Sequence, residues 1–200
     1  MFNLTELILS SGYIALFLTL FAETGLLLGF FLPGDTLLFA AGMLASKNIL
    51  NIYLLLFISF IAVILGDSFG YYLGKKVGKK IFENNHFFDS YLNPKNLEKS
   101  KKFFKKHGTK SIFFARYIPI IRTITPTLAG TVEMHYTSFL IYNILGGLSW
   151  VFSVVLLGFV LGNLIPNSME IITSLIILIV LVSIVLPPIL HRGSRKNKNN

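Results

Sequence analysis

The chain has 200 residues, of which 54% are hydrophobic and only 14% are charged, and its mean hydropathy is +0.69. This composition excludes an ordinary soluble domain and indicates an integral membrane protein. Lysine and arginine outnumber the acids by 18 to 9, but they gather in one internal loop and the C-terminal tail, which suits an anionic membrane surface better than nucleic acid. The absence of cysteine excludes disulfides, thiolate metal sites and cysteine nucleophiles.

The first apolar segment, residues 12–45, is interrupted. It is apolar from Gly12 to Leu32 except for Glu23 and a few neutral polar residues, and Pro33-Gly34-Asp35 then breaks it before a second apolar run. Backbone breaks at membrane depth predict a re-entrant hairpin that enters and leaves by the outer face. A complete span that would move the N-terminus to the cytoplasm stays open. No signal peptide is evident, so the first helix is expected to be retained.

Three segments reach the length of about 20 helical residues that a hydrocarbon core requires. They are residues 49–74, 137–165 and 171–190. Glycines recur at every fourth position from the end of the first segment to just beyond it, and a weaker pair lies in the second, which predicts smooth faces for close helix packing (Gly66, Gly70, Gly74, Gly78; Gly158, Gly162). Asp67 lies within the first ridge, where we expect it to form a hydrogen bond near the cytoplasmic end, with titration as the alternative.

The loop of residues 75–110 contains eleven cationic and three acidic residues. This excess of positive charge, together with that of the tail at residues 191–200, predicts that both lie in the cytoplasm. Asn93-Pro94 is typical of a helix start, and the pattern that follows up to Gly108 predicts an amphipathic helix on the inner leaflet. A solvated cytoplasmic linker is the alternative.

A second broken segment, residues 111–132, carries Arg116, Pro119, Arg122 and Pro126. Because the loop before it and the helix after it both begin in the cytoplasm, it is predicted to be a re-entrant hairpin from that side. Two sequence pairs resemble the caps of short half-helices, whose N-terminal amides favour anions, namely Asp35-Thr36 and Thr125-Pro126.

The two hairpins hold four charged residues at membrane depth: Glu23, Asp35, Arg116 and Arg122. Each unpaired charge at a helix centre costs about 2.5 to 3.5 kcal/mol, so we expect the acids of one hairpin to pair with the arginines of the other. One interpretation is two structural salt bridges between the hairpins. The functional interpretation is that proline lets the arginines converge on a phosphate, whose geometry the guanidinium fork matches, while burial favours the protonated form of Glu23.

Each half of the chain has a broken hairpin ending in Ala-Gly, followed by a long glycine-containing helix (Ala41-Gly42; Ala129-Gly130). The predicted fold is therefore a single domain over residues 1–200, an all-α polytopic membrane protein with two oppositely oriented re-entrant hairpins and about three full transmembrane helices. Such inverted repeats build the midplane sites of many transporters.

Three blocks of sequence carry a family resemblance: ETGLLLGFFLPGDTLLFAAG from Glu23, GDSFGYYLG from Gly66, and FARYIPIIRTITPTLAG from Phe114. They resemble the signature blocks of the DedA family, also called the SNARE-associated Golgi protein or VTT-domain family. The resemblance implies a bacterial cytoplasmic membrane protein that translocates a lipid, either undecaprenyl phosphate or phospholipid, with proton coupling. It also implies four functional residues (Glu23, Asp35, Arg116, Arg122). The breaks, the cap pairs and the glycine ridge add supporting residues beside them (Pro33, Gly34, Asp67, Pro119, Thr125, Pro126).

The buried charges distinguish among several functional classes. A lipid-phosphate flippase explains buried arginines, and a proton-coupled transporter of small solutes or cations explains the acids equally well. An enzyme is not expected, because no membrane histidine or nucleophile motif is present, and a scaffold leaves the charges unexplained. The four histidines lack ligand spacing, so neither metal nor cofactor is expected. The expected partners are anionic lipids and protons, without nucleic acid; a homo-oligomer stays open.

Overall fold

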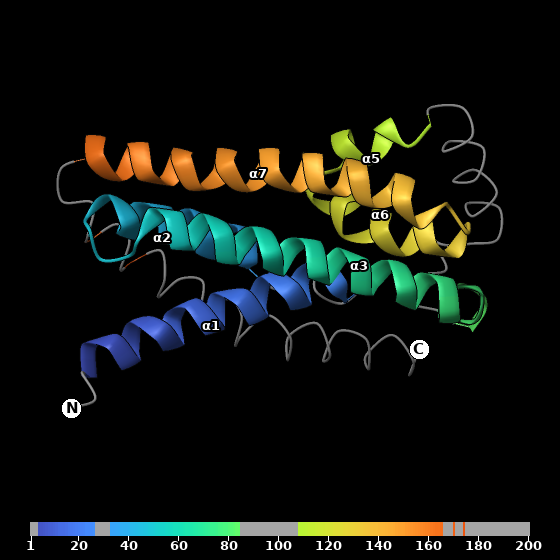
Figure 1. Cartoon of the computed structure of the whole chain (residues 1–200), viewed down its shortest axis with the longest axis horizontal. Coiled ribbons are helices and arrows are strands. Elements are labelled where there is room, and N and C mark those ends of the chain that lie inside the picture. The colour runs from blue at the N-terminus through green and yellow to red at the C-terminus, as the bar shows by residue number, and fades with distance from the viewer. Residues whose placement is uncertain (1–3, 27–32, 85–107, 166–169, 171–173, 175–200) are drawn as a thin grey trace, which may run out of the picture.

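The computed structural model describes residues 4–26, 33–84, 108–165, 170 and 174. Within these ranges every regular element is an α-helix (Figure 1). The predicted span at residues 171–190, the tail at 191–200 and the amphipathic helix expected after Asn93 lie outside the described residues, apart from isolated positions.

The first half of the chain forms α1 (Leu4–Gly25), α2 (Gly34–Ser46) and α3 (Ile52–Asn84). Asn51 caps α3, because its Oδ1 accepts hydrogen bonds from the amides of Tyr53 and Leu54 at 3.0 and 3.1 Å. The Asn51 amide in turn donates to the hydroxyl of Tyr13 at 2.8 Å. This contact joins α1 to the beginning of α3.

The second half forms α5 (Lys110–Ala115), α6 (Pro119–Thr131) and α7 (Tyr136–Leu164). Two stretches, Ile52–Lys76 and Tyr136–Leu164, are long and apolar enough to cross a membrane, which agrees with two of the three predicted spans. The helix that was expected to end at Gly74 continues to Asn84. The apolar stretch of this helix ends at Lys76, close to the predicted end of the span, and the helix itself continues because lysine is a good helix former.

Each short helix packs on the long helix of the other half of the chain: α2 packs on α7, and α6 packs on α3. Figure 1 places α2 and α6 toward opposite ends of the molecule. At 13 residues each, they are about 20 Å long, well short of a hydrocarbon core of about 30 Å.

Glycines make both contacts possible, as the ridges in the sequence predicted. A Cβ atom on Gly42 would collide with the carbonyl of Val155, and one on Gly158 with the carbonyl of Phe39. The same contacts recur in the other half, where Gly130 meets Tyr71 and Gly74 meets Thr127. The contact residues of α2 are separated from their counterparts in α6 by one constant number of positions, and those of α3 from their counterparts in α7 by another. This correspondence supports the predicted internal repeat.

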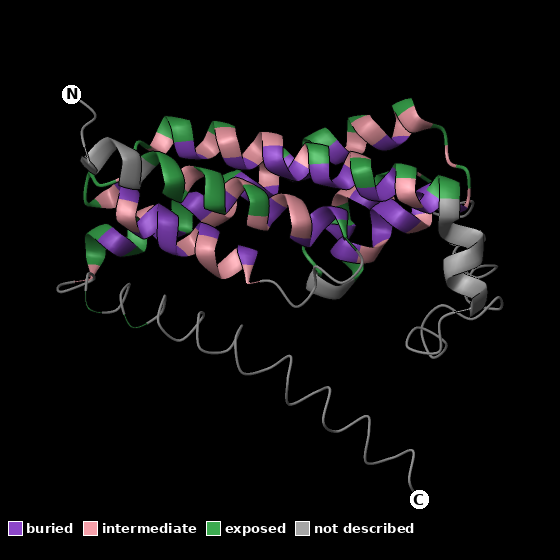
Figure 2. Cartoon of the chain, turned by 90° about the horizontal axis from the view of Figure 1, so that it is seen from below, coloured by how far each residue is buried: buried purple, intermediate pink, exposed green. Residues whose placement is uncertain are grey.

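Buried side chains form two apolar clusters. The larger joins α1, α2, α3 and α7 and includes Leu16, Leu38, Val63 and Val151. The smaller contains Tyr71, Ile112, Ala129 and Phe139. Exposed residues lie along the outward faces of the helices (Figure 2). Many of them are large and apolar, for example Tyr53, Phe57, Phe114 and Leu164, as expected of surfaces that contact lipid.

Candidate functional site: two buried arginine clusters

Two breaks in the backbone define the site. α1 ends at Gly25 and α2 begins at Gly34, with Pro33 as its N-cap. α5 ends at Ala115, and Ile118 is extended (φ −113°, ψ 108°) before α6 begins. The extended conformation follows from the proline at the next position, which disfavours the helical conformation at the residue before it. Each break places charged side chains between the long helices.

Arg122, on α6, makes the first cluster. Its Nη2 lies 2.6 Å from Glu23 Oε1 and 2.6 Å from Asp35 Oδ1. The side chains of Arg122 and Glu23 are buried, whereas 39% of the Asp35 side chain is exposed. The guanidinium carbon also lies 4.3 Å from the centre of the Trp150 ring, close enough for a cation–π interaction.

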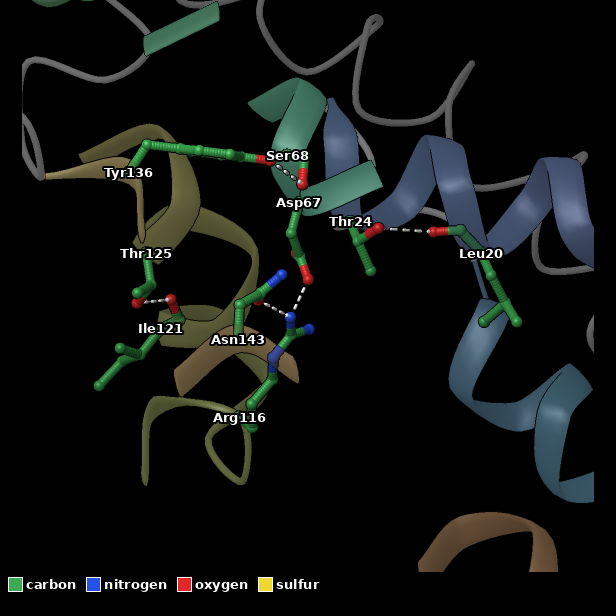
Figure 3. Close-up of polar contacts among 9 residues, drawn as sticks. All are labelled: Leu20, Thr24, Asp67, Ser68, Arg116, Ile121, Thr125, Tyr136 and Asn143. Atoms are coloured by element: carbon green, nitrogen blue, oxygen red, sulfur yellow. Dashed lines mark hydrogen bonds and ion pairs between the residues drawn. The ribbon is translucent and has the colours of Figure 1, made fainter. Parts of the chain in front are cut away.

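Arg116, at the end of α5, makes the second cluster (Figure 3). Its Nη2 forms an ion pair with Asp67 on α3 and donates a hydrogen bond to Asn143 Oδ1 on α7. Asp67 and Asn143 are fully buried, and Arg116 is 3% exposed. Gly146 provides space for the arginine stem, because a Cβ atom there would lie 2.9 Å from Arg116 Cγ.

The expectation that the acids of the first hairpin pair with the arginines of the second holds for Arg122 and is wrong for Arg116. Glu23 and Asp35 both lie on Arg122, and Arg116 is neutralised by Asp67. The expected role of Asp67 as an ordinary hydrogen-bonding group is therefore also replaced by that of a counter-ion. The reason is geometric, because the break at Tyr117 and Ile118 separates the two side chains, so that Arg116 reaches Asp67 of α3 while Arg122 reaches the acids of α1 and α2.

The site holds two arginines and three carboxyl groups. If all five were ionised, it would carry one net negative charge in surroundings that disfavour charge. One proton held on a carboxyl group would balance it. Within the described residues, no group of three histidine or acidic side chains could hold a metal ion.

Both helix starts that were predicted at the breaks are shifted. α2 begins at Gly34, so Asp35 lies in its first turn and does not cap it. Thr125 and Pro126 lie inside α6, where the Thr125 hydroxyl donates to the Ile121 carbonyl at 2.7 Å. A threonine in mid-helix can bond to the preceding turn in this way instead of capping. The exposed amides at this break therefore follow Pro119.

The structure gives Gly34 a clear role, because a Cβ atom there would collide with the Glu23 carboxylate. The gap between the arginines is lined by Ile112, Ala115, Arg116, Arg122, Thr125, Pro126 and Asn143, and it does not admit a water molecule. The apolar clusters lie on either side of the charges. Along α3, Asp67 falls between Val63 of the larger cluster and Tyr71 of the smaller. The site is thus closed in this conformation.

Asn143 and Trp150 were missed in the sequence. A signal was present for Asn143, because a lone amide inside an uncharged spanning segment is expensive unless it has a partner. Trp150 is the single tryptophan of the chain, but a large aromatic residue in a membrane helix is ordinary. Only the tertiary structure reveals that its ring contacts Arg122.

Comparison with known proteins agrees with the sequence blocks. The model of the VTT domain matches residues 32–160. Protein DedA of Escherichia coli K12 is 42% identical over 91% of this chain and 84% of its own length. An uncharacterized membrane protein of Mycobacterium leprae is 38% identical over 82% of the chain and 72% of its own length. For the inner membrane protein YqjA of Escherichia coli K12, the values are 33%, 76% and 68%.

No solved structure matches the chain significantly. The domain match covers more than half of the residues, from the end of the first break through the whole of the second, and it agrees with the relatives and with the two membrane-length helices. The chain therefore belongs to the DedA family of VTT-domain membrane proteins.

Proposed function

We propose that the protein transports a lipid phosphate, such as undecaprenyl phosphate or a phospholipid, across the bacterial cytoplasmic membrane. The observation that carries the proposal is the pair of buried arginines at two backbone breaks, each held by carboxylates. A phosphate group carries the same charge as these acids and fits the same guanidinium fork, so it can take their place. The tail of the lipid can stay in the bilayer while only the headgroup passes through the protein.

A topology with two re-entrant hairpins supports this proposal. Tyr13 of α1 contacts Asn51, and Ser46 at the end of α2 lies against Gly162, so both ends of the first hairpin reach the same end of α3 and α7. Ile112 of α5 and Ala129 of α6 share the opposite cluster with Tyr71. With the lysines after Gly74 in the cytoplasm, the proposed topology is multi-pass with α2 ending outside, and the positive charge of the tail sequence favours a cytoplasmic C-terminus.

The proton is assigned to Glu23. Its Oε1 pairs with Arg122, and its carboxylate lies against the backbone of Gly34. Protonation of Glu23 removes one of the two charges that hold Arg122, which frees the guanidinium for a phosphate. We propose no catalytic step, because the buried acids are used as counter-ions of the arginines.

A second candidate function is a proton-coupled transporter of small solutes or cations. The observation that favours it is the excess of acids over arginines in the buried site. The two functions differ in which substrate crosses a membrane that contains purified protein. Liposomes with a fluorescent lipid phosphate test the first function, and liposomes with an imposed cation gradient test the second.

The deciding experiment compares lipid classes and arginine variants in those liposomes. We expect lipid phosphates to cross faster than neutral or zwitterionic lipids. Arg122→Lys should slow transfer about tenfold or more, because an ammonium group is a point charge and cannot form the bidentate contact. Equal rates for all lipid classes, with Arg122→Lys as active as wild type, would replace the phosphate mechanism by unselective scrambling.

A further inference from the structure

Asn143 is the least expected member of the site. It is fully buried in α7, and its Oδ1 accepts a hydrogen bond from Arg116. Because a guanidinium group has only donors, Asn143 must turn its oxygen toward Arg116. Its amide nitrogen then faces elsewhere, and among the described residues Nδ2 has no acceptor.

Other buried donors share this condition. Arg116 Nη1 and Arg122 Nε and Nη1 also lack hydrogen-bond acceptors within the described part of the chain. The three side chains line the same gap between α5, α6 and α7. Buried donors without partners cost about 1 to 3 kcal/mol each and are uncommon in folded proteins, so a group that accepts from all of them would be bound favourably.

The polar side chains that line the gap offer mainly hydrogen-bond donors. Carboxylate oxygens without a hydrogen-bond donor among the described residues do exist nearby, on Glu23, Asp35 and Asp67, but none of these residues lines the gap. The polar groups that line it are two guanidinium groups, the Asn143 amide and the Thr125 hydroxyl, which already donates to Ile121. A set of donors of this kind matches an oxyanion and has little to offer an amine headgroup.

We propose that Asn143 is a headgroup-binding residue, whose Nδ2 donates a hydrogen bond to a phosphate oxygen of the transported lipid. This inference rests on the proposed function and adds a specificity determinant to it. The gap is too narrow for a phosphate while the acids hold the arginines, so Asn143 acts in the state that forms after the acids release them. Its oxygen keeps Arg116 oriented while its nitrogen contacts the phosphate.

The rival role for Asn143 is purely structural, as an acceptor that anchors Arg116. Asn143→Asp separates the two roles, because aspartate has nearly the same shape and keeps the acceptor for Arg116. It replaces the free amide donor by a second carboxylate oxygen. An anchoring role therefore predicts that the variant still binds a lipid phosphate, and a donor role predicts that it does not.

Trp150 supplies the measurement. It is the only tryptophan in the sequence, and its ring lies 4.3 Å from the Arg122 guanidinium carbon, so its emission reports on the site. The full chain, purified in detergent, is titrated with farnesyl phosphate and, as a neutral match, with farnesol. We expect wild type to prefer farnesyl phosphate and Asn143→Asp to bind it at least about tenfold more weakly.

Two further variants keep the test decisive if aspartate disturbs folding. Asn143→Ala removes the donor together with the acceptor for Arg116 and adds no charge, so it should also lose affinity, and wild-type affinity there would exclude both roles. Ser59→Ala is the matched control, because Ser59 is likewise fully buried, and its hydroxyl has no hydrogen-bond partner in the described part of the chain, but it does not line the gap. It should bind farnesyl phosphate as wild type does.

Wild-type affinity in Asn143→Asp or Asn143→Ala would overturn the role of Asn143 and leave the proposed transport of lipid phosphate standing. An equal loss in Ser59→Ala would overturn it as well, since the effect would then come from general packing. If the wild-type protein does not distinguish farnesyl phosphate from farnesol, the proposed function fails, and this inference fails with it.

Discussion

Arg122 contacts two acids that differ in their exposure to solvent. Glu23 comes from α1 and is buried, whereas Asp35 comes from α2 and keeps 39% of its side chain exposed. Trp150 covers a face of the guanidinium group, an attraction that does not depend on either carboxylate. The arginine can therefore exchange an acid for another anion while the indole ring still holds it.

The pair between Arg116 and Asp67 permits a stability test. Asp67→Leu and Arg116→Met should each destabilise the protein by about 3 to 5 kcal/mol, because each leaves an opposite charge buried without its partner. The double variant should recover most of that loss, since apolar residues can replace a buried ion pair, but it should not transport. Thermal unfolding in detergent measures the first effect and liposome transfer the second. If both single variants were as stable as wild type, the pairing would be contradicted.

Glu23 gives the predicted pH dependence. The charged groups next to it are Arg122 and Asp35, and lowering the pH protonates Glu23 and loosens its hold on Arg122. Transfer of a lipid phosphate should therefore rise as pH falls. Glu23→Gln, which is neutral at every pH, should be fast throughout and retain only the slope due to the phosphate itself.

The comparison for that experiment is Asp35→Asn. This change also weakens the hold on Arg122, but it keeps the buried carboxyl group of Glu23. It should preserve the pH dependence in liposome transfer assays. A pH profile of Glu23→Gln identical to that of wild type would eliminate Glu23 as the coupling group.

At the scale of helices, the exchange of short helices between the halves determines the packing. α2 rests on α7 and α6 on α3, in both cases with backbone against backbone at glycines. Close contacts of this kind leave little space for adjustment. Each short helix and its long partner should therefore move as a unit, so the ion pair between Asp35 of α2 and Arg122 of α6 joins the two units.

Glycine substitutions test the rigidity of these contacts. Gly158→Ala should destabilise the protein by about 1 to 3 kcal/mol, because its methyl group would collide with the Phe39 carbonyl and the backbone must shift. Gly12→Ala is the control, since its methyl group would meet nothing within 4 Å. The control should be neutral or stabilising by up to about 1 kcal/mol. Thermal unfolding of both variants decides the matter, and an unchanged Gly158→Ala would refute the close contact.

At the scale of the whole molecule, the contacts assign loops to two ends. Ser46 lies against Gly162 at one end. At the other, the Thr131 hydroxyl donates to the Gly74 carbonyl at 3.2 Å, and a Cβ atom on Gly130 would lie 2.8 Å from the Lys75 amide nitrogen. This grouping follows from the packing of the described helices and does not require a membrane orientation.

Because the sequence contains no cysteine, single cysteines can test this arrangement without background. Cysteines at Asn48 and Asn163 should react with an impermeant reagent added outside the cell. Cysteines at Lys76 and His135 should react only after the membrane is permeabilised. All four positions are exposed on the protein, so access depends on the membrane alone. Labelling of a cysteine at position 76 from outside would show that the orientation is the reverse of the one proposed.

The sequence alone determined the class of protein, two of its spanning helices, both broken segments and the identity of the four charged residues at the breaks. It could do so because the composition and length of apolar segments are local properties, and because proline, glycine and buried charge are costly enough in a membrane to stand out. The family resemblance, now confirmed by the VTT-domain match, rested on the same residues.

Only the tertiary structure decided how the charges pair. Which acid meets Arg116, and whether Asn143 and Trp150 belong to the site, depends on how α5, α6 and α7 lie against α3. The exact helix starts at Gly34 and Pro119 likewise could not be predicted from the local sequence. A threonine, for example, can cap a helix or form a hydrogen bond within one. Contacts between residues far apart in the chain depend on how the helices pack, and no single segment of the sequence determines that packing.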